Sequence, residues 1–279
     1  MKDHHLTSLR NILLLDRTQD LSETDILYPF ALDELLCRQT GKGGPAICHL
    51  WRHPHAFVLG LRDSRLPQAK EALHWLASLG RSTAVRNTGG AGVPLDPGVI
   101  NISLILPKTA GDDRHFHQDF EQMYTLIREA LRETGYPVEK GEIQGAFCPG
   151  DYDLSIAGRK FCGIAQRRQA KAYIVQAFVI AEGSGRERAK LAREFYERAA
   201  IGAAQPDYPI VEEQSTASLE ELAHIGPHAA QAFIDAIKRV IREQQSRDEA
   251  DRILPNGIIP TSEEIHAMAA TLRQRYGIS

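Results

Sequence analysis

Apolar residues recur along this chain at two different spacings. Intervals of three and four residues, which place side chains on one face of a helix, predict helices over residues 28–38, 68–79, 118–134, 186–199 and 228–244. Short apolar or alternating runs predict strands over residues 47–51, 56–61, 83–86, 99–106, 152–157, 160–165 and 173–180. The capping-box pairs Ser218/Glu221 and Thr261/Glu264 each predict the start of a further helix. Residues 1–22 follow neither spacing, and we expect an irregular lead-in there.

The order of these elements indicates the class of fold. Strands and helices mix without strict alternation, which favours an α+β fold with a mixed, mostly antiparallel sheet flanked by helices over a doubly wound fold. We expect a lead-in over residues 1–24, a main domain over residues 25–245 and a helical extension over residues 246–279. In that extension a charged stretch precedes what we expect to be an isolated helix.

Charge and hydropathy narrow the class of partner. The chain has 279 residues and a net charge of −3, so it carries no electrostatic footprint for nucleic acid or for an anionic membrane. No apolar run approaches the ~20 residues that span a bilayer. The apolar stretch at residues 12–15 is too short for the ~7–15-residue core of a signal peptide. We therefore expect a cytoplasmic protein with reduced thiols and with protein or small-molecule partners.

The four cysteines lie in different sequence contexts. No Cys-x-x-Cys pair is present, which argues against a zinc site or a thioredoxin-like site. Cys37 lies in a helical pattern and Cys48 in a strand pattern, as core cysteines usually do. Cys148 instead lies in a loop, directly before Pro149-Gly150. Its position alone leaves two interpretations open, a buried loop thiol and a nucleophile.

A nucleophilic cysteine has to react as a thiolate, and a nearby cation favours that form. The candidate cations closest in sequence are Lys160, Arg159, Arg167 and Arg168. We expect the last two of these to form a solvated charge cluster instead.

Strand geometry limits how Lys160 can meet Cys148. In a straight hairpin that turns at Gly158, Lys160 pairs near Ile156, about 26 Å from Cys148 at ~3.3 Å per residue. The two side chains meet only if the chain folds back at Pro149-Gly150, and these residue types are suited to a reversal.

The segment VRNTGGAGVPLDPGVINISLIL, residues 85–106, carries glycines at positions 89, 90 and 92 between two predicted strands. Glycine lets a backbone pass close to a ligand. No Gly-Lys-Ser/Thr and no helix pattern follow, so this is not a phosphate-binding loop. A β-turn without a ligand is the alternative.

Two histidine pairs have the spacing of possible metal ligands, His53/His55 and His115/His117. Neither pair has a third ligand of matching pattern, so we expect surface histidines and no metal site.

Together, these segments resemble the biotin/lipoate protein ligase catalytic domain over roughly residues 25–245. The helix with Asp33-Glu34-Leu35-Leu36 and the strand ending in Val58-Leu59-Gly60 match the opening of that family. The rest of the matching pattern consists of Arg86, Gly89-Gly90, Asp96, Asn101-Ile102-Ser103, a Cys loop, and Gly158-Arg159-Lys160-x-x-Gly163-x-Ala165-Gln166-Arg167.

The sequence departs from the ATP-using lipoate ligases of this family. Their glycine loop usually ends in His-Asp, where this chain has Leu95-Asp96, and Asn87 replaces a second arginine after Arg86. Cys148 is absent from those ligases and implies acyl transfer. Of two cysteine-dependent subfamilies, one takes octanoate from acyl carrier protein and the other from the octanoylated H protein of the glycine cleavage system. The run Phe-Cys-Pro-Gly-x-Tyr-Asp-Leu-Ser-Ile around Cys148 is similar to the second.

The resemblance implies an octanoyltransferase that needs neither ATP nor another cofactor. It implies that Cys148 forms an octanoyl thioester, while Lys160 holds the thiolate and passes protons. The implied substrate-binding residues are Arg86, Gly89, Gly90, Asn101, Gly163 and Ala165. The backbone amides of the last two are candidate donors to an oxyanion. We expect the other cysteines, Cys37, Cys48 and Cys162, to be dispensable.

The implied donor is the octanoylated H protein, and the implied acceptors are lipoyl domains of 2-oxoacid dehydrogenase complexes. The alternatives are an octanoyl-acyl carrier protein:protein octanoyltransferase, an ATP-dependent lipoate or biotin ligase, and a non-catalytic lipoyl-binding protein. A requirement for ATP would identify a ligase, and normal transfer by a Cys148→Ser variant would favour the non-catalytic alternative or another nucleophile.

Overall fold

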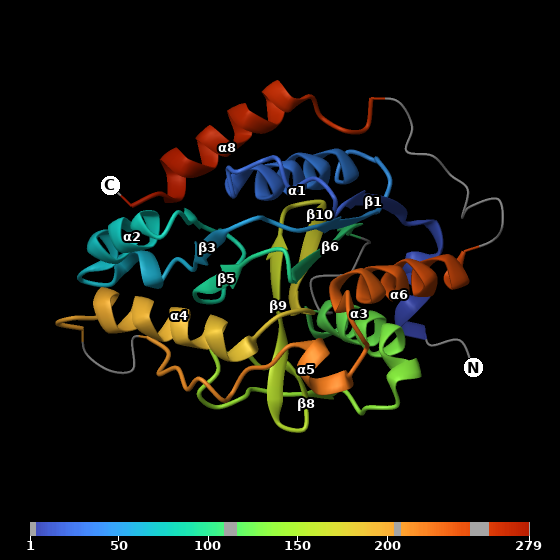
Figure 1. Cartoon of the computed structure of the whole chain (residues 1–279). Helices are drawn as coiled ribbons and strands as arrows, with labels where there is room; N and C mark the ends of the chain where they lie inside the picture. Colours follow the sequence, from blue (N-terminus) through green and yellow to red (C-terminus); the bar gives the residue numbers. More distant parts are fainter. Residues whose placement is uncertain (1–3, 109–115, 204–207, 246–256, 279) are drawn as a thin grey trace.

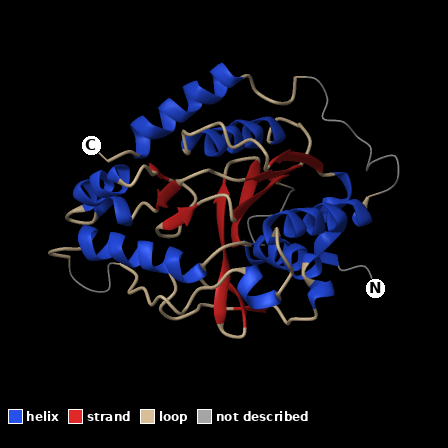
Figure 2. Ribbon diagram, viewed as in Figure 1, coloured by secondary structure: helices blue, strands red, loops and turns tan. Residues whose placement is uncertain are grey.

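The computed structural model describes residues 4–108, 116–203, 208–245 and 257–278. Within these ranges seven strands form one sheet, with helices on both of its faces (Figures 1 and 2). β1 pairs with β2 in parallel, and the other neighbours are antiparallel, which confirms the predicted α+β class with a mixed, mostly antiparallel sheet. In spatial order the strands are β1 (Leu13–Arg17), β2 (Ile47–Trp51), β6 (Val99–Pro107), β10 (Ala172–Ile180), β9 (Arg159–Arg168), β8 (Leu154–Ile156) and β7 (Glu139–Lys140).

A smaller sheet lies beside the main one and holds the segments around the glycine-rich loop. It consists of β4 (Ser82–Val85), β3 (Ala56–Leu59) and β5 (Val93–Leu95). β3 is parallel to β4 and antiparallel to β5. Two helices, α2 (Ala69–Ser78) and α4 (Gly185–Ala199), pack against each other next to this sheet. The short 3-10 helix η2 (Asp63–Arg65) follows β3.

Helices cover the two faces of the main sheet unequally. One face packs against α1 (Leu27–Thr40), and α8 (Ser262–Tyr276) lies along the outside of α1 (Figure 1). The opposite face packs against η1 (His4–Asn11), α3 (Phe116–Ala130), α5 (Leu219–Ala223) and α6 (Ala229–Gln244). The short 3-10 helix η4 (Arg132–Thr134) follows α3. Both predicted capping boxes are present, at the starts of α5 and α8.

Strand β6 shows why the sheet has two cores. Its residues 99–106 are all buried, and all of them except Asn101 and Ser103 are apolar. Successive side chains of a strand point to opposite faces, and Ile105 accordingly joins the α1 side while Ile102 and Leu104 join the α3 and α6 side. Two buried polar residues, Asn101 and Ser103, interrupt the apolar run on the α1 side. The functional site described below lies on that face.

Three expectations from the sequence are corrected. The lead-in is not irregular throughout, because β1 pairs with β2 and contributes Leu13 and Leu15 to the core. The glycine-rich segment does not lead directly from the strand predicted at 83–86 to the one at 99–106, because β5 intervenes, and β4 and β6 belong to different sheets. The C-terminal helix is not isolated, since α8 packs against α1 and its Ile265 and Ala269 are buried. The predicted division at residues 24 and 245 stays a prediction, and residues 246–256 lie outside the described part of the chain.

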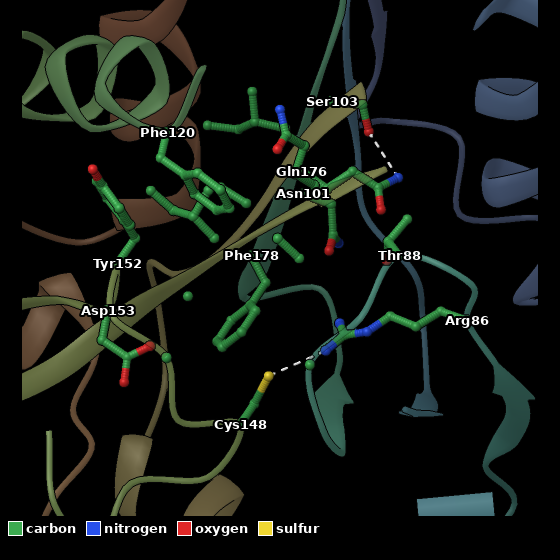
Figure 3. A pocket seen from close by; sticks show the side chains of 18 of the residues that line it. Arg86, Thr88, Asn101, Ser103, Phe120, Cys148, Tyr152, Asp153, Gln176 and Phe178 are labelled. Atoms are coloured by element: carbon green, nitrogen blue, oxygen red, sulfur yellow. Dashed lines mark hydrogen bonds between the residues drawn. The ribbon is translucent and has the colours of Figure 1, made fainter. Parts of the chain in front are cut away.

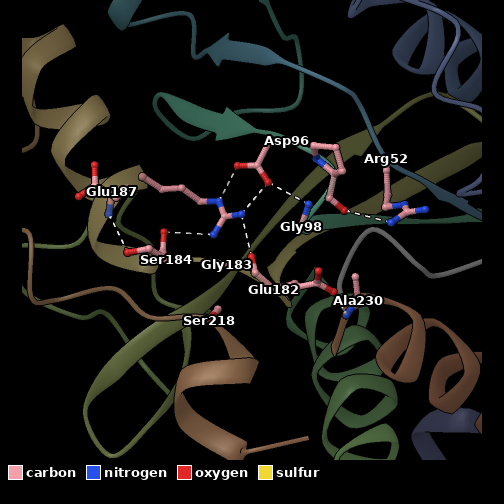
Figure 4. A network of polar contacts seen from close by, with 12 residues as sticks. Arg52, Asp96, Gly98, Glu182, Gly183, Ser184, Glu187, Ser218 and Ala230 are labelled. Carbon is pink, nitrogen blue, oxygen red and sulfur yellow. Dashed lines mark hydrogen bonds and ion pairs between the residues drawn. The ribbon is translucent and has the colours of Figure 1, made fainter. Parts of the chain in front are cut away.

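A polar junction joins the end of β5 to α4 (Figure 4). Arg188 of α4 donates to both carboxylate oxygens of Asp96, at 2.8 and 2.6 Å, and to the carbonyl oxygen of Glu182 at 2.8 Å. Asp96 also accepts from the backbone N–H of Gly98 at 2.9 Å. Asp96 therefore ties the start of β6 to α4, which is a structural role for a residue of the family pattern.

Candidate active site

Cys148 lies in the loop before β8, with a positive φ of 51°. The chain turns directly after it, where Asp153 donates its backbone N–H to the carbonyl oxygen of Gly150 at 3.0 Å. The turn spans residues 150–153, just after the predicted position at Pro149-Gly150, and Lys160 Nζ lies 2.6 Å from the Cys148 carbonyl oxygen. The straight-hairpin separation of about 26 Å at ~3.3 Å per residue therefore does not apply. The side chain of Cys148 is 8% exposed, at the edge of a cavity.

The Lys160 ammonium is completely buried and has three acceptors close to it. Its Nζ lies 2.9 Å from the carbonyl oxygen of Phe147, 2.6 Å from that of Cys148 and 2.7 Å from Asp153 Oδ1. An ammonium has three N–H donors, so these contacts match its capacity. Burial raises the pKa of the Asp153 carboxyl to about 6, although the Lys160 ammonium acts to lower it. Lys160 therefore fixes the backbone on which the Cys148 side chain is mounted.

The sulfur of Cys148 contacts a different set of groups. Arg86 Nη2 donates to Sγ at 3.1 Å, and the backbone N–H of Ala91 donates to it at 3.2 Å. The guanidinium also donates to the carbonyl oxygens of Gly89 and Ala91, both at 2.8 Å. Hydrogen bonds to a charged group favour that charged form, so this arrangement suits a thiolate at Cys148.

The glycine-rich loop has to approach the sulfur very closely. A Cβ on Gly90 would lie 2.9 Å from Cys148 Sγ and 2.4 Å from Arg86 Nη2, and Gly90 has a φ of +80°. Gly60 is restricted in the same way, since a Cβ there would lie 1.9 Å from the carbonyl oxygen of Gly90. Only glycine fits both positions without a shift of the backbone.

A buried tyrosine is hydrogen-bonded to the glycine-rich loop. The hydroxyl of Tyr196, on α4, accepts from the backbone N–H of Gly92 at 2.8 Å and donates to Asp63 Oδ1 at 3.0 Å. The other oxygen of Asp63 accepts from the backbone N–H of Gly60 at 2.8 Å. Tyr196 and Asp63 thus connect the two glycine segments that surround Cys148.

Cys148 opens onto a cavity of about 300 Å³ (Figure 3). That volume is at the lower end of the range for small-ligand sites. Most of its wall is apolar and comes from α1, the sheet and α3; the apolar residues are Phe30, Trp51, Ile102, Phe120, Ile164, Ala165, Ala177 and Phe178. The phenyl ring of Phe178 lines the cavity, and Lys160 Nζ lies 5.5 Å from the ring centroid. The cavity therefore suits an apolar chain attached at a polar end.

A buried polar cluster forms the part of the cavity wall away from Cys148 in Figure 3. Asp33 of α1 lies at its centre and accepts from Ser103 Oγ at 2.5 Å and from Gln176 Nε2 at 2.7 Å. His49 Nδ1 lies 2.7 Å from the other carboxylate oxygen of Asp33. Asp33 thereby anchors α1 to three strands of the main sheet, which explains the acidic residue in the family's opening helix.

Most of the predicted substrate-binding residues line this cavity, namely Arg86, Gly90, Asn101, Gly163 and Ala165. Gly89 lines a neighbouring groove with Leu61 and Tyr208 instead. Sequence reasoning missed the residues whose roles depend on distant partners, which are Thr88, Ser103, Asp153, Gln176, Phe178 and Tyr196. Asn101-Ile102-Ser103 lay in the matched pattern, and the polar interruption of an apolar run was the available signal for Ser103.

The backbone amides of Gly163 and Ala165 are committed to the sheet. Gln169 donates its N–H to the carbonyl oxygen of Ala172 at 2.9 Å, and hydrogen-bonded pairs alternate along an antiparallel ladder. The register of the two strands pairs Ala165 with Gln176 and Gly163 with Phe178, which are hydrogen-bonded pairs by this alternation. These two amides therefore donate to β10 and not into the cavity. Gly163 has a steric role, since a Cβ there would lie 2.6 Å from the Phe178 ring.

Some histidines and arginines lie in environments other than those expected from the sequence. His53 is 2% exposed and lies 3.2 Å from the carbonyl oxygen of Thr24, so it is not a surface histidine. His117 is exposed, as is His55, and His115 lies outside the described residues. Arg167 and Arg168 are not a solvated cluster, because they form half-buried ion pairs with Glu34 and Asp119. In the described ranges no three His, Cys, Asp or Glu side chains are grouped to hold a metal ion.

No helix in the part of the chain that the structure describes is both long and apolar enough to cross a bilayer.

Known proteins match most of this chain. The pattern of the lipoyl protein ligase A/B catalytic domain matches residues 25–242. An octanoyl-[GcvH]:protein N-octanoyltransferase of Macrococcus caseolyticus is 43% identical over 199 residues, which cover 70% of this chain and 71% of that protein. One of the same name from Geobacillus kaustophilus is 44% identical over 200 residues, covering 71% of this chain and 70% of that protein.

A solved structure shows the same fold. Lipoate-protein ligase A bound with ATP superposes with a TM-score of 0.66 at 18% identity, over 97% of this chain and 99% of that one. The fold, the family pattern and these relatives define the class: the chain belongs to the lipoyl protein ligase A/B catalytic-domain family. Within that family its relatives are protein N-octanoyltransferases, and the chain is accordingly an acyltransferase.

Proposed function

We propose that this enzyme transfers an octanoyl group from octanoyl-lysine of the glycine cleavage H protein to the lipoyl-domain lysine of 2-oxoacid dehydrogenase subunits. The transfer proceeds through a thioester on Cys148. The observation that carries the proposal is the position of the Cys148 sulfur, which receives two N–H donors and lies at the edge of an apolar-walled cavity. Relatives at 43% and 44% identity, named for octanoyl transfer from this H protein, support the choice of donor.

The first step is acylation of the enzyme. The Cys148 thiolate attacks the carbonyl carbon of the octanoyl-lysine amide, the S–C bond forms, and the C–N bond breaks. The donor lysine nitrogen leaves as an amine and takes up a proton. The second step reverses these events with the acceptor lysine, so the bond formed resembles the bond broken. No ATP is consumed in either step.

A proton has to move at the lysine nitrogen in both steps, and we assign this role to Lys160. Its ammonium is buried and lies 2.6 Å from the carbonyl oxygen of Cys148. A lysine can give and regain a proton, whereas the Arg86 guanidinium stays protonated in a protein. Arg86 supports the thiolate, and Lys160 serves as general acid and then as general base.

The cavity accounts for selection of the acyl group. The aromatic and aliphatic residues around it, including Phe30, Phe120 and Phe178, offer an apolar surface to the chain. At ~0.8 kcal/mol per buried methylene, the six methylenes of an octanoyl chain contribute about 5 kcal/mol to binding. A polar metabolite would gain little from the same walls.

Mass spectrometry of the enzyme tests this proposal directly. Purified enzyme mixed with octanoylated H protein in the absence of ATP should gain one octanoyl group on Cys148. Addition of a lipoyl domain should then discharge it. The Cys148→Ser variant should gain nothing, while Cys162→Ala should behave as the wild type. A strict requirement for ATP would contradict the proposal, and labelling from octanoyl-acyl carrier protein alone would replace the donor.

A further inference from the structure

Two polar side chains line the Cys148 cavity without a use in the steps described so far. They are Thr88, in the loop after β4, and Asn101, on β6. Within the described chain, Thr88 Oγ1 and Asn101 Nδ2 are buried atoms that have no hydrogen-bond partner. Buried polar atoms are almost always paired in folded proteins. Two unpaired donors facing one cavity therefore indicate a ligand that accepts hydrogen bonds.

The positions of the two residues relate them to the reacting sulfur. Thr88 lies two residues after Arg86, which donates to Cys148 Sγ. It lies two residues before Gly90, where a Cβ would be 2.9 Å from the same sulfur. Asn101 pairs with Phe178 of the neighbouring strand β10, and Lys160 Nζ lies 5.5 Å from the Phe178 ring centroid. Figure 3 shows both side chains directed into the cavity, between Arg86 and Gln176.

We propose that the Thr88 hydroxyl and the Asn101 carboxamide form the oxyanion site of the acyl transfer. This inference rests on the proposed thioester mechanism. When Sγ bonds to the carbonyl carbon, the C=O π electrons move to the oxygen, and both side chains donate hydrogen bonds to that oxygen. The electrons return when the C–N bond breaks and the lysine nitrogen leaves with a proton from Lys160.

Other donors near the sulfur are already used in this structure. The N–H groups of Gly163 and Ala165 donate to β10, as the ladder register requires. Arg86 Nη2 and the Ala91 N–H donate to Sγ itself. Trp51 Nε1 is a further buried atom without a partner in this cavity's wall. Its ring packs edge-on against Phe30, with the ring centroids 5.3 Å apart. The Trp51 indole is therefore the competing candidate for the oxyanion donor, and a Trp51→Phe variant tests it.

The test compares two reactions of the same sulfur. Acylation by p-nitrophenyl octanoate passes through an oxyanion, whereas alkylation by iodoacetamide displaces iodide at a saturated carbon and forms none. Thr88→Val and Asn101→Leu should each slow single-turnover acylation by about 10²–10³-fold, the usual effect of removing one oxyanion donor. Alkylation rates should stay within a factor of about two, because these variants leave the contacts of Sγ intact. Thr88→Ser, which keeps the hydroxyl, should acylate at close to the wild-type rate.

The outcomes separate this inference from the proposed function. The small ester needs no carrier protein, so an error in the proposed donor leaves the comparison valid. Equal acylation by wild type, Thr88→Val and Asn101→Leu would overturn the oxyanion site, as would parallel losses of acylation and alkylation. A loss confined to Trp51→Phe would also overturn it and assign the role to the indole. Should Asn101→Leu fail to fold, the Thr88→Val and Thr88→Ser pair decides the question.

Discussion

Arg86 Nη2 lies 3.1 Å from the sulfur of Cys148, while Lys160 Nζ lies 2.6 Å from the carbonyl oxygen of the same residue. The two cations near the nucleophile therefore contact different parts of it. The guanidinium presents a fixed planar donor to the sulfur and stays charged. The ammonium holds the backbone turn and keeps an exchangeable proton. The family resemblance implied that Lys160 both holds the thiolate and passes protons; we propose instead that Arg86 supports the thiolate and that Lys160 passes the protons.

Replacing Arg86 should slow every reaction of the Cys148 thiolate. A hydrogen bond to a charged group contributes about 1.5–3 kcal/mol, so Arg86→Met should reduce the alkylation rate at neutral pH by about 10–100-fold. Acyl-enzyme formation should fall at least as far, because Arg86 also holds the carbonyl oxygens of Gly89 and Ala91. Arg65→Met, at an exposed arginine of η2, is the matched control. An Arg86→Met enzyme alkylated as fast as the control would refute the assignment.

Cys148 should be the only cysteine that reacts in the native protein. Burial raises the pKa of Cys37 to about 12, and it also raises the pKa of the completely buried Cys48 and Cys162. Brief treatment with iodoacetamide at pH 7.5 (about one unit below an ordinary thiol) followed by peptide mapping should find the label on Cys148 alone. Cys37→Ala and Cys162→Ala should retain acyl-enzyme formation. Native labelling of Cys162 would show that another thiol is accessible.

The Asp153–Lys160 pair should make stability depend on pH in a defined window. The folded-state pKa of Asp153 is raised from 3.8 to about 6, so the folded protein holds a proton that the unfolded chain releases. The stability that this bound proton contributes is fully present below about pH 4 and is lost as the pH rises through about 6. The total loss is on the order of 3 kcal/mol. Urea denaturation between pH 4.5 and 7 (roughly this window) should show that wild-type stability falls relative to Asp153→Asn. A constant difference between the two proteins would contradict the shift.

The junction between Asp96 and Arg188 should matter for stability more than an exposed ion pair does. Arg188 is nearly buried and its guanidinium donates to both oxygens of Asp96. Removal of the carboxylate leaves the nearly buried Arg188 charge without this partner, so Asp96→Asn should lower the free energy of unfolding by about 2 kcal/mol or more. The exposed pair Arg239–Glu133 is the control, with an expected loss of about 0–1 kcal/mol. A double-mutant cycle in urea measures each coupling, and equal values for the two pairs would refute the prediction.

Local patterns in the sequence predicted most of the helices and strands, the chain reversal after Cys148 and the loop position of that cysteine. The apolar stripe of α6 and the continuous run of β6 follow from periods that involve neighbouring residues only, so they could be predicted. The residue pair Pro149-Gly150 is also a local signal, which predicted a reversal after Cys148, and the turn forms at residues 150–153. The family pattern supplied Arg86 and Asn101 as site residues and the cysteine as nucleophile.

The tertiary structure decided which of these residues touch one another. Arg86 and Cys148 are 62 positions apart, and Asp63 and Tyr196 are 133 apart. Such contacts depend on strand order and register, which periodicity does not encode because every register that keeps the same faces buried satisfies it. The strand β1 was missed for the same reason: its parallel partner β2 lies across an intervening helix. The residue types and their local turns are therefore written in the sequence, whereas the sulfur's hydrogen-bond partners and the free donors of the cavity arise only when the two sheets and α1 come together.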